Sequence, residues 1–508
     1  MISLYTDKNQ SFAKKGELLA LFFLMGVALW FRLKSLPNYP LVDDELGTLS
    51  ALKGIVATGL PRLDGNGLLY WRALLPHYLM ALPLFFTDAT VQAARIVPTL
   101  FSVLILPVAY AGGRMLSGRF AAWLLVGFLA FSNYQNYHAA FARFYLPFQF
   151  FFFAATLLGG SYFILGRQKH GTWLLAATLA TIASHELSIS LLPLLGLAFL
   201  CGRRWELLRS WLFWSTIVLV SGFIWGNIFW TPEQVFYPYV TPLIMGGMLN
   251  KWAFYEDFGR YMPLAWTLIL LGMLPIYYDR SRLWIYLWCG FLGEMVFLSV
   301  VVPYNSPRYM SHLFPFGTLL AMASLCWCIG QLYKKFQKGV WGSSRQALLV
   351  GCTVTLLALL HLALFENLER RNWFGDSLTS FDQRPAHEFM ANWVTPQDVV
   401  ISMDPGVTEY FLGRPVNYFL RERLDPVTHS FGPFEPTVKG NNHNYYIDSP
   451  ERLQEVLATT PQRIWLYVNH KRASATSVQL QRLINKTFYA AFYDEQNENS
   501  VLAYQLEP

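Results

Sequence analysis

Charged residues are scarce in this chain. Asp, Glu, Lys and Arg make up 14% of its 508 residues, while hydrophobic residues make up 54% and aromatic residues 17%. Ordinary soluble chains carry about 25% charged residues. Several apolar stretches also reach the length of about 20 residues that a helix needs to cross a bilayer. The composition therefore excludes a large soluble enzyme and predicts a polytopic helical membrane protein.

Cysteine is rare as well, and several well-known catalytic signatures are missing. No P-loop, GxSxG or dinucleotide-binding fingerprint occurs, so the sequence carries no signature of chemistry on nucleotides or of a serine hydrolase. The polar C-terminal tail has no cysteine, which excludes a disulfide-stapled module there, and no cysteine spacing matches a zinc site. All five cysteines lie in or beside apolar segments: Cys201, Cys289, Cys326, Cys328 and Cys352.

Apolar segments divide the first part of the chain into eleven expected membrane spans. The first follows basic residues, as a signal peptide does, but its apolar stretch is long and no A-x-A-like site follows it. We therefore expect an uncleaved first span. The expected spans are 17–36, 93–113, 120–137, 146–166, 172–186, 187–202, 211–230, 262–278, 283–302, 313–333 and 346–365.

Lys and Arg residues orient these spans. In the eleven-span arrangement, six basic clusters fall in alternate loops and so on one side of the membrane, which the positive-inside rule assigns to the cytoplasm. We read this basic excess as a topology signal and expect no nucleic-acid partner. The clusters are Lys8/Lys14/Lys15, Arg114/Arg119, Arg167/Lys169, Arg203/Arg204/Arg209, Arg280/Arg282 and Lys334/Lys335/Lys338/Arg345.

An odd number of spans places the tail outside the cytoplasm. Residues 366–508 hold 13 Lys/Arg against 18 Asp/Glu, a net charge of −5, whereas the whole chain is at +7. The segments 398–404 and 463–469 read as buried strands, and 385–394 and 449–459 read as helices. The fold class is therefore an all-α polytopic membrane body (1–365) with an extracytoplasmic α/β domain (366–508). The body includes a first outer loop at 37–92 and an aromatic, partly mobile outer loop at 231–261.

Three consecutive acids follow the first span. Asp43, Asp44 and Glu45 stand in PNYPLVDDELGTLSA, and acids near lipid are costly enough to need a function. A carboxylate can act as the general base that takes a proton from an acceptor hydroxyl. The alternative is a capping role, because the residues after them favour a helix and acids are common at helix starts.

Cationic residues are expected at the same outer face. Arg72, Arg143, His185 and Arg308 stand near span ends, with Tyr309 beside Arg308. Together they would bind a phosphate group and stabilise charge that develops on it. The alternative for each one is that it is an anchor whose charged end reaches the membrane surface. Arg95, at the start of the second span, belongs to the same group.

A metal site is the less favoured interpretation. His138, His185 and His312 fall near the outer face, and Glu186, Glu256 and Asp257 are available carboxylates. No HxxxH or HExxH spacing occurs. We therefore expect no metal and no cofactor, with a divalent cation as the open alternative, and interpret these groups as polar residues at helix ends.

The motifs around the acids resemble the GT-C superfamily of polyprenyl-phosphate-sugar glycosyltransferases. The similarity is to the protein O-mannosyltransferases and the bacterial aminoarabinose transferase that acts on lipid A, and it covers about residues 1–335. The motifs are Asp44-Glu45 after the first helix, LSALKGIVATGLP, YWRALLPHYL and AARIVPTLFSVL, in that order.

The resemblance implies roles for individual residues. Asp44 would be the catalytic carboxylate with Glu45 as its companion, while the purpose of Asp43 stays unexplained. Arg72 falls where the family contacts donor phosphate, and Tyr309 matches a Pro-x-Tyr that helps to hold it, with Arg308 beside it. His185 falls where bacterial relatives often have Lys. The chain departs from the family at Leu146-Pro147, where relatives often read Asp-Pro, and this argues further against a metal.

The resemblance also implies a reaction. We expect an inverting glycosyltransferase of the inner membrane that moves a sugar from a polyprenyl-phosphate carrier, such as undecaprenyl phosphate, to a hydroxyl of a protein, lipid or glycan outside the cytoplasm. The rival class is a transporter or flippase of lipid-linked sugars, which would favour charges inside the spans, and Glu294 is the clearest acid in such a place. A membrane-anchored binding protein, the third class, would not need eleven spans.

Overall fold

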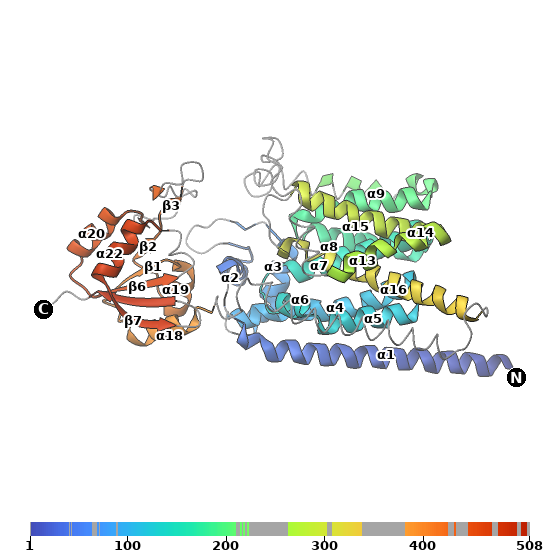
Figure 1. Cartoon of the computed structure of the whole chain (residues 1–508), viewed down its shortest axis with the longest axis horizontal. Helices are drawn as coiled ribbons and strands as arrows, with labels where there is room; N and C mark the ends of the chain where they lie inside the picture. The colour runs from blue at the N-terminus through green and yellow to red at the C-terminus, as the bar shows by residue number, and fades with distance from the viewer. Residues whose placement is uncertain are drawn as a thin grey trace. The chain divides into compact units, whose positions relative to one another are not determined.

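The computed structural model describes most of the chain in two compact units (Figure 1). One unit comprises residues 1–36, 55–61 and 70–373, and the other comprises 37–54, 62–69 and 374–508. We call them the membrane unit and the α/β unit. The described residues are 2–39, 41, 43–62, 69–70, 72–87, 90–209, 263–301, 307–337, 382–424, 431–432, 446–469, 476–494 and 499–504, with short pieces between 214 and 222.

The membrane unit is built almost entirely from helices, whose order follows the chain. Its α-helices are α1 (Ile2–Ser35), α3 (Leu74–Ala81), α4 (Val91–Leu116), α5 (Arg119–Phe131), α6 (Asn133–Ala139), α7 (Tyr145–Gly159), α8 (Gly171–Ile182), α9 (Leu191–Gly202), α13 (Pro263–Leu271), α14 (Met273–Asp279), α15 (Arg282–Val301) and α16 (Leu313–Gln337). Short 3-10 or π turns join them: η2 (Leu82–Phe85), η3 (Gly160–Ile164), η4 (Gln168–His170), η5 (Glu186–Ser190), η6 (Trp205–Arg209) and η7 (Pro307–Met310). η1 (Leu36–Asn38) follows α1.

Five of these helices are long and apolar enough to cross a membrane. They cover 15–35, 91–116, 145–164, 282–300 and 313–331, and each coincides with an expected span. Shorter apolar helices occupy 119–131, 186–202 and 268–279, near three further expected spans. The expected span at 120–137 is too long, because the chain leaves helical geometry at Ser132 and starts α6. The span at 346–365, most of 211–230 and the loop at 231–261 lie outside the described residues, and the count of eleven stays a prediction.

Glycines allow close helix packing in the membrane unit. A Cβ atom on Gly113 of α4 would lie 2.5 Å from the Cα atom of Ala122 in α5, and one on Gly159 of α7 would lie 2.6 Å from a side-chain atom of Leu195 in α9. The sequence pairs Gly112-Gly113 and Gly159-Gly160 therefore mark contacts at which backbones or large side chains approach closely, as small residues do between membrane helices.

The first helix is joined to its neighbours by a buried arginine. Arg32 is 1% exposed. Its guanidinium donates to the carbonyl oxygens of Ser102 at 3.0 Å and Leu129 at 2.9 Å, and to Oδ1 of Asn136 at 3.0 Å. A cation inside an apolar bundle is tolerated when carbonyl oxygens replace its hydration. Arg32 therefore fixes the end of α1 against α4, α5 and α6.

The α/β unit is a twisted sheet covered by helices. Its strands are β1 (Val399–Ser402), β2 (Tyr418–Leu420), β3 (Arg423–Leu424), β4 (Phe431–Gly432), β5 (Tyr446–Ile447), β6 (Ile464–Asn469), β7 (Tyr489–Asp494) and β8 (Asn499–Tyr504). Its helices are α18 (Arg384–Trp393), α19 (Pro405–Leu412), α20 (Pro450–Thr459) and α22 (Val478–Thr487). The main sheet has the order β5-β2-β1-β6-β8-β7 and β3 pairs with β4.

The sheet combines parallel and antiparallel strands. β5, β2, β1 and β6 run parallel, with Val399 opposite Ile464, while β8 and β7 form an antiparallel edge. The two strands expected from the sequence are β1 and β6, which pair directly at the centre of the sheet. The two expected helices are α18 and α20, and Ser449 caps α20 by accepting the N–H of Arg452 at 3.2 Å. Separate apolar clusters cover the two faces of the sheet.

One helix from the N-terminal part of the chain packs with this unit. It is α2 (Asp43–Thr58), and a Cβ atom on Gly406 at the start of α19 would lie 2.9 Å from Cδ1 of Leu46. Just before α2, the carbonyl oxygen of Pro37 accepts a hydrogen bond from Nη1 of Arg384 at 2.8 Å. The segment 37–54 therefore packs against the C-terminal part of the α/β unit.

Candidate active site

The three acids open helix α2 in the α/β unit. The helix begins at Asp43, whose side chain lies outside the described residues. Asp44 is half-buried, whereas Glu45 is fully buried. A general base must reach a substrate proton, so accessibility favours Asp44 for that role and Glu45 for a supporting one. The helix start also matches the capping alternative, because acids there interact favourably with the helix dipole.

An ion pair joins two segments of the membrane unit that are far apart in the sequence. Nη2 of Arg72 donates to Oε1 of Glu186. The turn before α3 brings them together: Ala73 adopts the left-handed conformation, and the N–H of Leu75 donates to the carbonyl oxygen of Ala183 at 3.0 Å. The Arg72 side chain is 25% exposed and that of Glu186 7%. Glu186, which the sequence offers as a metal ligand, therefore serves as the partner of Arg72.

His185 lies between this ion pair and a group of aromatic rings. Its Nδ1 accepts the N–H of Leu187 at 3.0 Å and stands 3.5 Å from Oε2 of Glu186. Its ring centroid lies 4.7 Å from that of Phe144, 5.0 Å from Phe148 and 6.5 Å from Tyr309. The ring is buried, and Nε2 has no hydrogen-bond partner among the described residues. It can therefore still donate to an added acceptor.

Two further arginines cover rings of the same group. The guanidinium carbon of Arg143 stands 4.7 Å from the ring centroid of Phe144, and that of Arg308 stands 5.6 Å from the ring centroid of Tyr309. Arg143 and Tyr309 are buried, and Arg308 is half-buried. Such contacts position a cation beside an aromatic face.

The five substrate-binding residues expected in this unit thus form one connected group, which Arg308 joins through Tyr309. We call the group of Arg72, Arg143, His185, Glu186, Arg308 and Tyr309 the Arg/His cluster. It holds three guanidinium groups and one carboxylate, so an anion placed there would meet an excess of positive charge in a poorly hydrated setting, where Coulomb attraction is strongest.

Neighbouring groups extend the cluster. His138 lies 5.9 Å from Tyr145 between ring centroids, and burial together with the charge of Arg308 lowers the pKa of His138 to about 3. A neutral imidazole leaves the positive charge to the arginines. Arg95 has a structural role instead: it is 1% exposed and its Nη1 donates to the carbonyl oxygen of Leu36 at 3.3 Å.

Several buried polar contacts were not expected from the sequence. Nε2 of His312 stands 3.6 Å from Oε2 of Glu294. Nε2 of Gln149 donates to the carbonyl oxygen of Ser311 at 2.6 Å, and its Oε1 accepts Nε2 of Gln135 at 2.9 Å. The available signal was the presence of polar residues inside apolar runs such as YLPFQFFFF.

No metal centre is formed by the part of the chain that the structure describes. No group of three or more His, Cys, Asp or Glu side chains stands there in an arrangement that could hold an ion. His185 and His312 both contact Phe148, but each is beside a different carboxylate. The histidines therefore belong to two separate polar contacts.

Solved structures share the fold of the chain, whereas neither a family model nor a curated sequence matches it. ArnT from Cupriavidus metallidurans bound to undecaprenyl phosphate has a TM-score of 0.55 and 16% identity over 96% of this chain and 98% of its own. The same protein in the apo state gives a TM-score of 0.55 and 15% identity over 97% and 98%.

An archaeal protein gives a weaker match. The Archaeoglobus fulgidus oligosaccharyltransferase has a TM-score of 0.49 and 11% identity, over 96% of this chain and 74% of its own. ArnT and the archaeal oligosaccharyltransferase are both of the GT-C type, the group that the sequence resembles. At this level of identity, the ArnT match shows a shared fold in which a multi-helix membrane body carries a small sheet domain.

Proposed function

We propose that this protein is an integral-membrane, inverting glycosyltransferase. It takes a sugar from a polyprenyl-phosphate carrier and joins it to an acceptor hydroxyl outside the cytoplasm. The N-terminus is cytoplasmic and the α/β unit extracytoplasmic, in a multi-pass arrangement of the inner membrane. The acceptor is a hydroxyl of a protein, a lipid or a glycan.

The observation that carries this proposal is the Arg/His cluster in a helical membrane body. Three arginines, a histidine and a tyrosine from distant segments gather there, together with a single carboxylate. A polyprenyl phosphate needs such a setting for its anionic group next to an apolar path for its chain. ArnT, which shares the fold, was solved with undecaprenyl phosphate bound.

The proposed reaction uses the Arg/His cluster together with Asp44. Asp44 takes the proton of the acceptor hydroxyl while that oxygen attacks the anomeric carbon and forms the new glycosidic bond. The bond from the anomeric carbon to the phosphate oxygen breaks, and its electron pair leaves with the polyprenyl phosphate. Attack opposite the leaving group inverts the anomeric carbon. Arg72, Arg143 and Arg308 stabilise the additional negative charge, and Tyr309 donates a hydrogen bond to it.

The remaining residues have supporting roles. Glu186 orients Arg72, and Nε2 of His185 donates to the phosphate. Glu45, which follows Asp44 in the chain and is buried, supports the start of α2. No step requires a metal ion, in agreement with the departure from the family at Leu146-Pro147.

Replacement of Asp44 by Asn tests the chemistry. D44N keeps the size of the side chain but cannot accept a proton, so transfer from a radiolabelled polyprenyl-phosphate sugar in membranes should fall at least about 100-fold, the usual contribution of general base catalysis. D448N changes a half-buried acid of the same unit and is the matched control. Full activity of D44N in a folded protein contradicts the assignment.

The same assay separates the enzyme from the transporter alternative. The buried contact of Glu294 and His312 inside the membrane unit is the observation that would favour transport. A flippase moves the labelled lipid between leaflets and leaves the sugar on its carrier. Donor that is translocated in proteoliposomes but not consumed would therefore replace the proposed enzyme with a flippase.

A further inference from the structure

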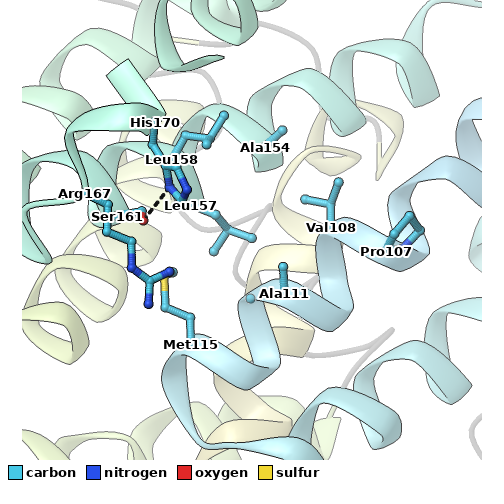
Figure 2. Close-up of a pocket in the computed structure, with 11 residues that line it drawn as sticks. Pro107, Val108, Ala111, Met115, Ala154, Leu157, Leu158, Ser161, Arg167 and His170 are labelled. Carbon is cyan, nitrogen blue, oxygen red and sulfur yellow. Dashed lines mark hydrogen bonds between the residues drawn. The ribbon is translucent and has the colours of Figure 1, made fainter. Parts of the chain in front are cut away.

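An apolar pocket lies in the membrane unit, at the C-terminal ends of helices α4 and α7. It has a volume of about 350 Å³ and is lined mostly by apolar side chains from the C-terminal halves of both helices, among them Pro107, Ala111 and Met115 of α4. Figure 2 shows these walls together with Ala154 and Leu158 of α7. An apolar pocket among helices of this kind suits a hydrocarbon chain.

The pocket has a polar end. Ser161, Arg167 and His170 are its only polar lining residues, and Figure 2 places them together, away from Pro107. Oγ of Ser161 and Nδ1 of His170 are 2.7 Å apart, and Arg167 is exposed. A hydroxyl, an imidazole and a guanidinium beside an apolar wall match a phosphate next to an acyl chain.

A local departure from helical geometry creates this end. The α7 helix changes at Gly160 into the π turn η3, which carries Ser161. The carbonyl oxygen of Ser161 accepts the N–H of Arg167 at 3.1 Å, so the chain turns back and presents Arg167 to the pocket. π turns of this type occur often at functional sites because they displace side chains from the regular helical positions.

The position of the pocket decides between two phosphate-bearing lipids. Arg143 precedes and Arg167 follows the apolar segment Tyr145–Ile164, which at 1.5 Å per residue is roughly 30 Å long. A lipid whose phosphate meets Arg167 therefore cannot present that phosphate to the Arg/His cluster. The occupant is therefore not the polyprenyl-phosphate molecule that would be bound at the Arg/His cluster, and an ordinary membrane phospholipid fits the pocket without a role in that site.

We propose that this pocket binds one anionic phospholipid, with an acyl chain between α4 and α7 and its phosphate against Arg167, His170 and Ser161. Lys169, which is exposed and stands two positions after Arg167 in the chain, favours a lipid with net negative charge over a zwitterionic one. The pocket is thus a structural lipid site on the membrane face opposite to the Arg/His cluster. The proposal is independent of the reaction that the protein catalyses.

Native mass spectrometry of the full-length protein tests this site. The delipidated protein is titrated with phosphatidylglycerol, phosphatidylcholine or undecaprenyl phosphate. We expect one phosphatidylglycerol to be retained at least about tenfold more strongly than phosphatidylcholine. Both lipids carry the phosphate, but the choline ammonium cancels its charge, and each basic residue near the head group contributes about 1 kcal/mol toward a net anionic lipid. Undecaprenyl phosphate should bind in addition to this lipid and should not displace it.

Two variants with matched controls locate the binding. R167Q removes the charge and should lower phosphatidylglycerol retention about tenfold. R167K keeps the charge and should retain more of this lipid than R167Q does. R203Q is the control for both, because it alters an exposed arginine outside the pocket lining. A111F fills the pocket from an exposed position, whereas L104F adds a ring to an exposed position of α4 outside it. Both controls should bind like the unmodified protein.

Three results would overturn the proposal. They are equal retention of the anionic and zwitterionic lipids, displacement of phosphatidylglycerol by undecaprenyl phosphate, and unchanged retention in both R167Q and A111F. A monodisperse elution profile is required of every variant, and if R167Q fails this test, A111F decides the question. Sugar transfer can be measured separately, because none of these residues belongs to the Arg/His cluster.

Discussion

The ion pair of Arg72 and Glu186 allows a prediction in which two variants lose similar stability but differ in ligand binding. Removing one member of a fully buried pair costs roughly 3–5 kcal/mol, because the other charge stays buried without compensation. Arg72 is 25% exposed here and Glu186 7%. We therefore expect R72Q and E186Q each to lower the free energy of unfolding by about 2 kcal/mol, since water can partly reach Arg72.

The two variants should differ in their binding of undecaprenyl phosphate. R72Q removes a cation and should weaken binding of undecaprenyl phosphate about tenfold, the effect of one charge-assisted hydrogen bond. E186Q removes the only carboxylate of the Arg/His cluster while it keeps an oxygen that can accept from Arg72. It should bind the lipid at least as tightly as the unmodified protein.

A double-mutant cycle completes this test. Thermal unfolding in detergent gives the stabilities of R72Q, E186Q and the double variant, and the double variant should cost at least about 1 kcal/mol less than the sum of the single ones. The matched control is the pair of Arg119 and Glu17 at 2.9 Å, whose arginine is 55% exposed. R119Q should cost less than about 1 kcal/mol. Additive stabilities, or equal loss of lipid binding in R72Q and E186Q, would refute the reasoning.

Two further predictions concern folding. Burial lowers the pKa of His387 to about 4, so its neutral form is favoured in the folded state. The contribution of neutral His387 to the free energy of unfolding is fully present above the unfolded pKa of about 6.5. It falls by roughly 3 kcal/mol as the pH decreases to 4. Hydrogen exchange of β1, measured against pH, should show this loss in the unmodified protein and lack it in H387Q. G113A should lower the melting temperature because its Cβ would meet Ala122, whereas G127A, with nothing within 4 Å, should leave it unchanged or raise it. An equal response of both glycine variants, or an unaltered pH dependence in H387Q, would contradict these accounts.

The sequence predicted what depends on local pattern. The apolar run 398–404 and its counterpart 463–469 identified β1 and β6, because a buried parallel strand reads as a continuous apolar segment. The helix start at the acids and the five long apolar helices follow from the same kind of signal. The positive-inside rule grouped Arg72, Arg143 and Arg308, because all three are basic residues on the side of the membrane where the rule expects few.

Contacts between distant segments could not be read in this way. Glu186 pairs with Arg72 across 114 positions, and nothing near either residue marks the pairing. The sequence likewise placed 37–92 with the membrane body, whereas the contacts of Leu46 and Pro37 are with Gly406 and Arg384. Such choices depend on the shape of packed surfaces, which a single sequence does not display.

The attachment of α2 to the sheet domain has a consequence for biosynthesis. Pro37 and Arg384 are separated by 347 positions, so the helix with the three acids leaves the ribosome long before α18 and α19, which contact this segment, exist. A nascent chain can insert its first helices while α2 still lacks its neighbours. The segment that begins α2 would thus reach its final position only after the C-terminal part has folded, and a chain interrupted before residue 384 would reach the membrane without a positioned Asp44.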